Sequence, residues 1–249
     1  MDLGVRGRRA IVAAGSAGLG LATAQALVDE GVRVAICGRD PDRLAAAVAT
    51  LGALAVGVEA DLSNATGALA FATAAEEQLG GTIDIVVANA GGPPPGMPSA
   101  TTIEGYQTAL DLNCLSTIAL IQTVVPAMRA QGWGRVLAIT SIGARQPIPF
   151  LAASTVARAA TTAFIKNLAT EVAGDGVTAN TIQPGSHLTA RNAELTAGQS
   201  DELARSIPAG RLGDAADFGA AAAFLCSEQA NFICGASLIV DGGASRGLQ

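Results

Sequence analysis

Short apolar runs and longer helical segments alternate along almost the whole chain of 249 residues. Each apolar run has the composition of a strand that is buried on both faces. Strict alternation of such strands with helices predicts a parallel sheet that is covered by helices on both faces. No linker, repeat or change of composition marks a second domain, so we expect one doubly wound, Rossmann-type α/β domain over residues 1–249, with about seven strands. The expected strands are Arg9–Ala13, Val32–Cys37, Ala53–Val58, Ile83–Ala88, Arg135–Thr140, Val177–Ile182 and Ser237–Val240, and the expected helices are Gly18–Glu30, one that begins at Pro41, Asn64–Leu79, Thr102–Ala130, Phe150–Ala173 and Asp214–Cys226.

The composition supports a folded domain and excludes several classes of function. Half of the residues are hydrophobic and 14% are charged, so the chain can bury a sizeable core. The net charge is −6 and the only lysine is Lys166, whereas a nucleic-acid-binding protein needs a basic face. Four scattered cysteines without a CxxC pair and a single histidine match no common zinc motif. We therefore expect no metal and no nucleic acid, and reduced thiols in a cytoplasmic protein.

An uncharged stretch from Ala10 to Val28 follows three arginines, as in a signal peptide or a membrane span. Glycines and polar residues interrupt this stretch, so a strand, a glycine turn and a helix account for it better. We expect no other segment to be long and apolar enough to cross a bilayer. A membrane is therefore not an expected partner.

A glycine-rich turn joins the first expected strand to the first expected helix. Its sequence is Ala13-Ala14-Gly15-Ser16-Ala17-Gly18-Leu19-Gly20. Glycines at such a turn let the backbone approach a pyrophosphate closely, and the helix N-terminus supplies free N–H groups and a partial positive charge. The alternative is a tight turn that binds no ligand. The strand before the turn and the helix after it favour a dinucleotide site.

The end of the second expected strand indicates which dinucleotide binds. In nucleotide-binding sheets an acidic residue at this point binds the adenosine ribose, whereas a nearby arginine accommodates a 2′-phosphate. Cys37-Gly38-Arg39 has glycine in the place of the acid and an arginine next to it. We therefore expect NADP(H) rather than NAD(H) as the cofactor. A solvated loop cation is the alternative interpretation of Arg39, and the neighbouring Asp40 is a small argument against the 2′-phosphate.

Several further motifs follow in a fixed order. They are Asp61-Leu62 after the third strand, Ala88-Asn89-Ala90-Gly91 after the fourth, Asn113 in the long helix, Ser141 after the fifth strand, Asn180-Thr181-Ile182-Gln183-Pro184-Gly185 with Thr189, and Val240 to Gly243. In these motifs and in the glycine turn the chain resembles the short-chain dehydrogenase/reductase family over nearly its whole length. The family's turn motif is TGxxxGxG, in which Ala13 and Ala14 replace the threonine and the first glycine. The resemblance implies cofactor-binding roles for Gly15, Ser16, Ala17, Gly18, Leu19, Gly20, Arg39, Asp61, Leu62, Asn89, Ala90, Gly91, Arg158, Pro184, Gly185, His187 and Thr189.

The chain departs from this family at the catalytic positions. The family places a Tyr-x-x-x-Lys motif after the serine, and the same spacing from Ser141 gives Ser154 and Arg158. No shift of register restores the pair, because Tyr106 is the only tyrosine and Lys166 lies two further turns down the helix. Ser154 and Arg158 are four residues apart and therefore share one face of a helix.

This substitution limits the chemistry of the predicted site. In the family the tyrosine exchanges a proton with the substrate oxygen, while the lysine lowers the pKa of that tyrosine and holds the nicotinamide ribose. Arg158 supplies a fixed charge and donors for the ribose. The Ser154 hydroxyl is far too basic to replace the phenol as an acid–base group. Ser141 and Ser154 can still donate hydrogen bonds to an oxyanion, and Asn113 completes the expected catalytic set.

The source of the proton is open. The ordinary pKa of a histidine side chain suits acid–base catalysis, so His187 is one candidate. A structural role for this loop residue is the alternative. A water molecule relayed through Asn113 is a second candidate source. A third option is a substrate that needs no strong acid from the protein, such as an iminium ion or an activated enone.

Two loops are expected to form the substrate cleft. The proline-rich loop Gly92–Pro98 forms one wall, and Met97, Phe150 and Leu151 either line it or simply pack. Residues 186–207 form a substrate lid, a kind of segment that is commonly mobile. The resemblance also implies a homotetramer or dimer that pairs its long helices.

We therefore expect an NADP(H)-dependent oxidoreductase that transfers a hydride to or from a small carbonyl, alcohol or related substrate. Its site combines Ser141, Ser154 and Arg158. Two alternatives remain open because a fold does not fix a reaction. One is a lyase or isomerase that transfers no hydride, and the other is a cofactor-binding protein without turnover. The lost Tyr/Lys pair favours these alternatives, whereas the retained nucleotide motifs favour cofactor binding.

Overall fold

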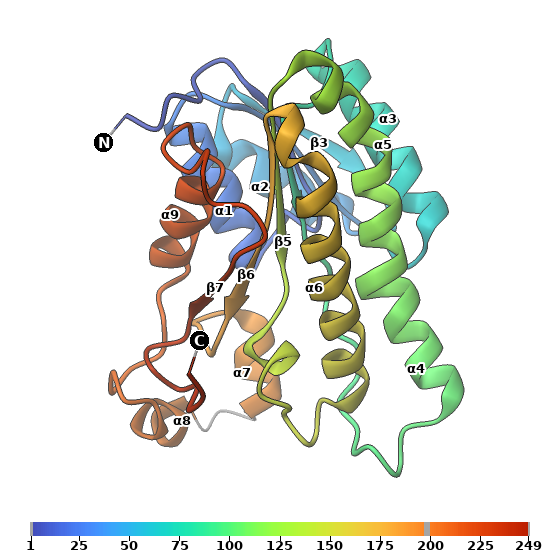
Figure 1. The fold of residues 1–249 in the computed structure, drawn as a ribbon. Coiled ribbons are helices and arrows are strands. Elements are labelled where there is room, and N and C mark those ends of the chain that lie inside the picture. The colour runs from blue at the N-terminus through green and yellow to red at the C-terminus, as the bar shows by residue number, and fades with distance from the viewer. Residues whose placement is uncertain (1, 197–199, 249) are drawn as a thin grey trace.

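Seven parallel strands form one sheet in a computed structural model that describes residues 2–196 and 200–248 (Figure 1). The strand order is β3-β2-β1-β4-β5-β6-β7. This confirms the predicted α/β fold with a parallel sheet. The strands are β1 (Arg9–Val12), β2 (Arg33–Gly38), β3 (Ala55–Glu59), β4 (Ile85–Ala88), β5 (Gly134–Ile139), β6 (Val177–Pro184) and β7 (Ser237–Val240).

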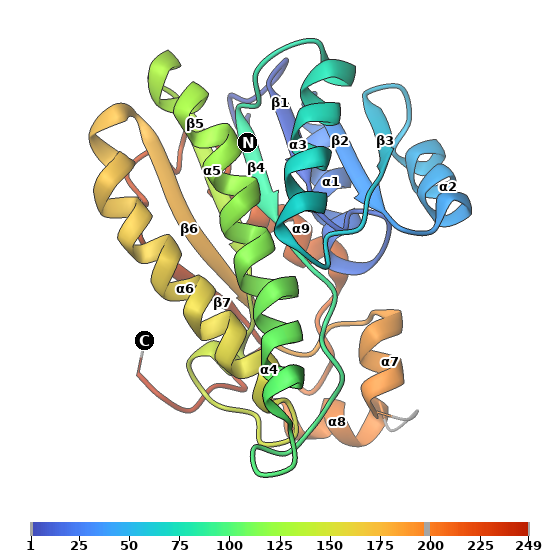
Figure 2. The same ribbon diagram turned by 90° about the vertical axis from the view of Figure 1, so that its right-hand side faces the viewer.

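Helices cover both faces of the sheet, as Figures 1 and 2 show. Each face has its own buried apolar cluster, built mainly from Ala, Val, Leu and Ile. The helices on one face are α3 (Ala65–Leu79), α5 (Ser116–Gln131) and α6 (Ala152–Val172), and those on the other are α1 (Gly18–Asp29), α2 (Pro41–Leu51) and α9 (Ala215–Leu225).

One long helix over Ile103–Gln131 is not uniform. It comprises α4 (Ile103–Leu110), a π-helical segment η1 (Asp111–Leu115) and α5. The extent of the helix was predicted, but the π segment was not. By length and composition alone this helix is apolar enough to cross a membrane, so the expectation that no segment besides Ala10–Val28 qualifies is wrong. Half of its most apolar part is buried inside the protein, where α5 packs against α3 and α6.

Helix α1 starts without a side-chain cap, as α6 also does. Five α-helices are preceded by an N-cap residue whose side chain accepts a backbone hydrogen bond, and these residues are Asp40, Asn64, Thr102, Thr189 and Asp214. The residue before α1 is Ala17, whose methyl group cannot accept a hydrogen bond. The first N–H groups of α1 therefore have no side-chain acceptor. The stretch Ala10–Val28 thus folds as the predicted strand, turn and helix.

The strand order places a crevice between β1 and β4. The sheet grows in opposite directions from these two strands, and ligands of open parallel sheets bind outside the carboxyl ends at such a point. The glycine turn follows β1, and the Asn89-Ala90-Gly91 loop follows β4. Two short helices of the predicted lid, α7 (Ala190–Thr196) and α8 (Ser200–Ser206), lie beyond this end of the sheet (Figure 1). Residues 197–199 of that lid lie outside the described residues.

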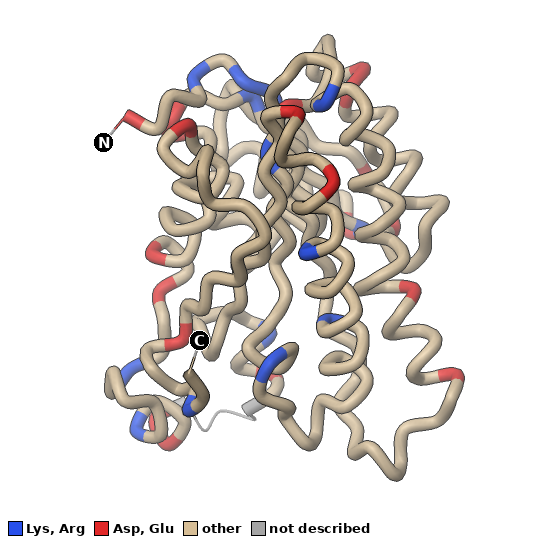
Figure 3. Tube along the Cα trace, in the orientation of Figure 1, with Lys and Arg blue, Asp and Glu red and all other residues tan. Residues whose placement is uncertain are grey.

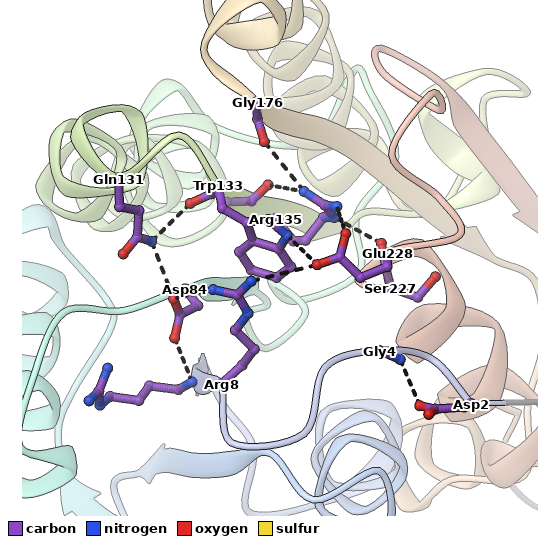
Figure 4. A network of polar contacts seen from close by, with 12 residues as sticks. Asp2, Gly4, Arg8, Asp84, Gln131, Trp133, Arg135, Gly176, Ser227 and Glu228 are labelled. Atoms are coloured by element: carbon purple, nitrogen blue, oxygen red, sulfur yellow. Dashed lines mark hydrogen bonds and ion pairs between the residues drawn. The ribbon is translucent and has the colours of Figure 1, made fainter.

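The opposite end of the sheet carries a network of polar contacts (Figure 4). The Trp133 ring lies between the guanidinium groups of Arg8 and Arg135, whose Cζ atoms are 3.7 Å and 4.3 Å from the ring centroid. Trp133 Nε1 donates a hydrogen bond of 2.7 Å to Glu228. Arg8 also forms an ion pair of 3.3 Å with Asp84. The network therefore ties the start of β5 to the segment before β1 and to the segment after α9.

Candidate functional site

The glycine turn is packed too closely to admit side chains. A Cβ built on Gly15 lies 2.7 Å from Ile36 Cγ2, and one built on Gly20 lies 2.6 Å from the Ala14 carbonyl oxygen. Gly18 has a φ of +58°, in the left-handed region that favours glycine. Ala17 and Gly18 are exposed at this turn, and phosphate binding by its backbone stays a prediction.

Ala14 replaces the first glycine of the TGxxxGxG motif, and the backbone of Ala14 is strained. Its φ is +47°, a positive value that no other non-glycine residue in the described part of the chain has. An alanine in this region costs about 1 kcal/mol. The Ala14 N–H donates to Cys37 Sγ at 3.4 Å, and its carbonyl accepts from Asn89 Nδ2 at 3.4 Å. The turn therefore keeps its shape despite the substitution and is tied to β2 and to the loop after β4.

An acidic side chain at the end of β2 would have to displace the Ser16 hydroxyl. A Cβ built on Gly38 lies 2.7 Å from Ser16 Oγ, so the Ser16 hydroxyl occupies the space where that side chain would begin. Arg39 is exposed and makes no side-chain hydrogen bond or ion pair with any described residue. Asp40 is engaged elsewhere, because it accepts a hydrogen bond from the Arg43 backbone N–H and pairs with the Arg43 side chain at 3.1 Å. That backbone hydrogen bond, with the Arg43 charge, lowers the pKa of Asp40.

Asp61 and Leu62 lie where β3 leads into α3. Asp61 is exposed and accepts a hydrogen bond of 3.0 Å from the Ser63 N–H, whereas Leu62 is buried in the core. A surface groove of about 510 Å³ runs beside Asp61 along α3. This groove includes neither Ser141 nor Arg158, so it is separate from the predicted catalytic residues.

Asn113 and Arg158 hold the loop after β4 from two sides. Asn113 lies in the π segment, and its Nδ2 donates to the Gly91 carbonyl at 2.9 Å. Arg158 lies on α6 and donates from Nη1 to Ile139 O at 2.9 Å and from Nη2 to Ala90 O at 3.3 Å. Three of its five N–H donors are left for another acceptor. The structure thus brings both predicted residues to the carboxyl end of β4 and β5.

Arg158 keeps its charge at neutral pH. Burial, and after it the charge of Arg191, lowers the pKa of Arg158 to about 10. The guanidinium therefore remains a fixed cation and cannot exchange protons near neutral pH. Its charge and free donors fit the expected contact with a ribose.

Ser141 directly follows β5 and has the hydroxyl of Thr155 nearby, whereas Ser154 lies on α6. Ser141 Oγ accepts a hydrogen bond of 3.0 Å from the Gly143 N–H, which leaves its own O–H free to donate. Ser154 is half-buried in the first turn of α6. A Cβ built on Gly143 lies 3.2 Å from Ser141 Oγ and 3.4 Å from Thr155 Oγ1. Thr155 Oγ1 is buried without a hydrogen-bond partner among the described residues. This residue was missed by the sequence prediction, because Thr155 lies between Ser154 and Arg158 at a position to which the motif assigns no role.

The His187 ring is packed into the protein rather than left free. It is 4% exposed and contacts Phe218 of α9 edge-on at a centroid distance of 5.3 Å. Its Nδ1 is 3.1 Å from the Gly185 carbonyl oxygen, and burial lowers the pKa of the ring. These contacts favour the structural interpretation over a catalytic one. The backbone of His187 remains next to Pro184 and Gly185, at the carboxyl end of β6.

Thr189 meets the glycine turn across the crevice. Its Cγ2 lies 3.7 Å from a Cβ built on Gly18. The start of the lid therefore lies against the predicted phosphate site. This contact brings together two predicted cofactor-binding residues that are far apart in the sequence.

Neither Tyr106 nor Lys166 replaces the missing catalytic pair. The Tyr106 hydroxyl donates to Pro98 O at 3.4 Å, and its ring packs against a small cluster that includes Ala153 of α6. Lys166 Nζ donates to Gly235 O at 3.1 Å, in the loop before β7. Both side chains are therefore used elsewhere, as the sequence predicted.

The proline-rich loop is fixed to the start of α6. The Gly96 N–H donates to Phe150 O at 2.8 Å, and the Gly96 carbonyl accepts from the Ala152 N–H at 3.2 Å. The side chains of Met97 and Phe150 are about half exposed beside this connection. A second residue missed by the sequence prediction, Arg191 of α7, reaches the same loop and is described below.

The fold and site together define a Rossmann-type α/β protein with a glycine-rich turn at the switch point of its sheet. A family model described as Enoyl-(Acyl carrier protein) reductase matches residues 13–245. The chain belongs to the short-chain dehydrogenase/reductase family.

Relatives of known activity are dehydrogenases and reductases. L-fucose dehydrogenase of Bos taurus is 35% identical over 269 residues, which cover 99% of this chain and 93% of the relative. The 2-dehydro-3-deoxy-L-rhamnonate dehydrogenase (NAD(+)) of Sphingomonas sp. (strain SKA58) is 31% identical and covers 95% of both chains. The crystal structure of L-sorbose reductase from Gluconobacter frateurii, complexed with NADPH and L-sorbose, superimposes with a TM-score of 0.94 at 32% identity and covers 100% of both chains. NAD(+) and NADPH both occur by name among these relatives, so the comparison does not distinguish the two cofactors.

Proposed function

We propose that the protein is an NADP(H)-dependent oxidoreductase that transfers a hydride to or from a small carbonyl, alcohol or related substrate. The observation that carries this proposal is the arrangement at the end of β2. An acidic side chain at Gly38 would displace the Ser16 hydroxyl, which lies against Gly38, and the Arg39 side chain has no hydrogen-bond or ion-pair partner among the described residues. A serine hydroxyl beside an arginine suits a 2′-phosphate, since both donate hydrogen bonds to anionic oxygens.

The residues around the crevice fit the rest of a dinucleotide. The glycine turn and the uncapped start of α1 suit the pyrophosphate, while Asn89-Ala90-Gly91 and Arg158 suit the nicotinamide ribose. Pro184, Gly185 and Thr189 are assigned to the nicotinamide end. When bound, the nicotinamide supplies or accepts the hydride.

The protein's own residues stabilise charge at the reacting oxygen. We assign the free O–H groups of Ser141 and Ser154 as donors to that oxygen, and Arg158 as the nearby fixed cation. None of the three is an acid or base matched to neutral pH. The site therefore suits substrates that need no strong acid from the protein, such as an activated enone.

Nucleotide titration tests the cofactor assignment. We expect NADPH to bind more tightly than NADH when nicotinamide fluorescence is followed. Arg39→Ala should weaken NADPH by about tenfold, the usual effect of losing one charged hydrogen bond, and should leave NADH nearly unchanged. Arg33→Ala, an exposed arginine at the other end of β2, is the control. Equal losses for both nucleotides would contradict the 2′-phosphate assignment, and no binding below the millimolar range would contradict the proposed function.

Turnover tests the catalytic assignment. A panel of aldehydes, ketones and enones is assayed for NADPH oxidation with wild-type protein, Ser141→Ala and Arg158→Ala. We expect both variants to lower kcat by at least about tenfold. An unchanged kcat in both variants would contradict the catalytic assignment of Ser141 and Arg158. Tight nucleotide binding without oxidation of NADPH on any substrate would favour the non-redox or inactive alternative.

We also propose that the protein is a homo-oligomer, a dimer or tetramer. Strand β7 is the edge of the described sheet, and exposed apolar side chains lie on it and just before it, at Leu238 and Phe232. An apolar sheet edge of this kind favours pairing with a second copy. Light scattering should give two or four times the chain mass of 24.6 kDa. A monomer at micromolar concentration would contradict this proposal.

A further inference from the structure

Two arginines from different elements hold the loop that follows β4. Arg158 of α6 donates to Ala90 O at 3.3 Å, and Arg191 of α7 donates from Nη2 to Pro93 O at 2.9 Å. The Arg191 guanidinium also lies against Gly92, where a built Cβ would be 2.9 Å from Nη2. Because Ala90 and Pro93 are three residues apart, their Cα atoms are separated by at most roughly 12 Å. Two cations therefore converge on one short segment of the cleft wall.

These two positive charges are poorly compensated. Arg158 has no carboxylate partner among residues 2–196 and 200–248. Arg191 pairs with Glu194 at 3.6 Å, but their side chains are 42% and 69% exposed, and such surface pairs are weak. The charge of Arg191 also contributes, after burial, to the lowered pKa of Arg158, because the two guanidinium groups repel each other. In a protein of net charge −6, this part of the cleft is therefore locally positive.

The position of Arg191 places it between the two predicted subsites. Thr189, two residues earlier, contacts the glycine turn at Gly18, while Arg191 itself reaches the proline-rich wall at Pro93. Figure 3 shows both basic and acidic segments at this end of the molecule, where α7 and α8 lie. One Arg191 donor is used on Pro93, and the planar guanidinium retains other N–H groups for a second acceptor.

We propose that Arg191 is an anion-binding residue of the cleft. It donates N–H groups from the lid to the oxygens of an anionic group, with Arg158 supplying the second positive charge. The group is either a carboxylate on the substrate or a phosphate of the dinucleotide. This inference rests on the proposed function for the identity of the ligand, but the positive site itself follows from the contacts of the two arginines.

The test compares Arg191→Gln and Arg191→Lys with a matched control. Arg211→Gln is the control, because Arg211 is an exposed arginine beyond α8 that pairs with Asp217 at 3.5 Å. Three probes are used: NADPH followed by fluorescence, inorganic pyrophosphate followed by its effect on the unfolding temperature, and turnover of a 2-oxo acid against its methyl ester. We expect Arg191→Gln to weaken at least one anionic probe by about 10- to 100-fold, Arg191→Lys to recover part of the loss, and the control to stay within about twofold.

The probes separate the two sources of the anion. Weaker binding of NADPH and pyrophosphate identifies a phosphate, whereas a loss of kcat/KM for the acid but not for the ester identifies a substrate carboxylate. If Arg191→Gln matches Arg211→Gln on every probe while the wild type binds NADPH, the inference fails and the proposed function stands. If the wild type binds no nucleotide but responds to pyrophosphate only when Arg191 is present, the proposed function fails and the inference stands. No response to any anion overturns both.

Discussion

Replacing Glu228 by glutamine tests how strongly the polar network at the amino ends of the strands stabilises the fold (Figure 4). The Glu228 carboxylate accepts the Trp133 N–H at 2.7 Å and lies 3.6 Å from Arg8 and 3.7 Å from Arg135. The Arg135 side chain is 2% exposed, and its Nε donates to Ser227 O at 2.9 Å. Glu228→Gln keeps the size and a carbonyl acceptor but removes the charge. It leaves a buried guanidinium whose other partners are backbone carbonyls and the Trp133 ring.

The size of the effect follows from burial on each side of the pair. Removing one partner of a fully buried ion pair costs about 3–5 kcal/mol. The Glu228 side chain is 41% exposed, so solvent screens much of that loss. The Trp133 hydrogen bond also weakens by about 1 kcal/mol when its acceptor loses its charge. We expect the free energy of unfolding to fall by about 2 kcal/mol, which lowers the Tm of a chain of this length by roughly 4–8 °C.

Urea unfolding measures this change, and the single tryptophan, Trp133, reports on the network itself. Glu171→Gln is the control, since the Glu171–Arg129 pair is short at 2.7 Å but both side chains are exposed. We expect the control to change stability by less than about 1 kcal/mol. If both variants shift the unfolding midpoint equally, the network contributes no more than a surface ion pair and the reasoning from burial is refuted.

Three further predictions concern Ala14, His187 and Thr155. Ala14→Gly should raise the free energy of unfolding by up to about 1 kcal/mol by relieving its left-handed backbone, whereas Ala45→Gly in the exposed middle of α2 should lower it by about 1 kcal/mol in the same urea assay. Because burial lowers the pKa of His187, the unfolded chain takes up the proton first, so stability is lost as pH falls below about 6.5. His187→Gln should flatten the stability profile below that pH, and parallel profiles for variant and wild type would contradict the assignment. Thr155→Val should raise the free energy of unfolding by about 1 kcal/mol because the buried hydroxyl has no described partner, and a decrease would show that it has one.

Much of the fold follows from local sequence patterns. The strand Ala53–Val58 was predicted and is observed at Ala55–Glu59, and other boundaries differ by similarly small amounts. The π segment Asp111–Leu115 escaped prediction, because one wider turn hardly disturbs the apolar pattern of a long helix. Local patterns also suffice to select the predicted nucleotide-binding residues, since those turn and loop residues directly follow individual strands.

The remainder of the candidate site depends on contacts between distant elements. Arg191 reaches Pro93 across almost a hundred positions, and no spacing in the sequence indicates this contact. The Ser16 hydroxyl lies 2.7 Å from the point where a Cβ on Gly38 would be, and this is evident only when β1 and β2 are placed side by side. For His187 the sequence leaves a catalytic and a structural role open, and its packing against Phe218 favours the structural one.

The bridging role of Arg158 has a consequence for protein engineers. Its flat fork spans the ends of β4 and β5 by binding Ala90 O and Ile139 O together. An ammonium carries the same charge but lacks that fork. Ser154→Tyr and Arg158→Lys together would restore the family's tyrosine and lysine. They would thus add an acid but remove the paired hydrogen bonds to Ala90 O and Ile139 O. We therefore expect the double substitution to need compensating changes in the loop after β4 as well.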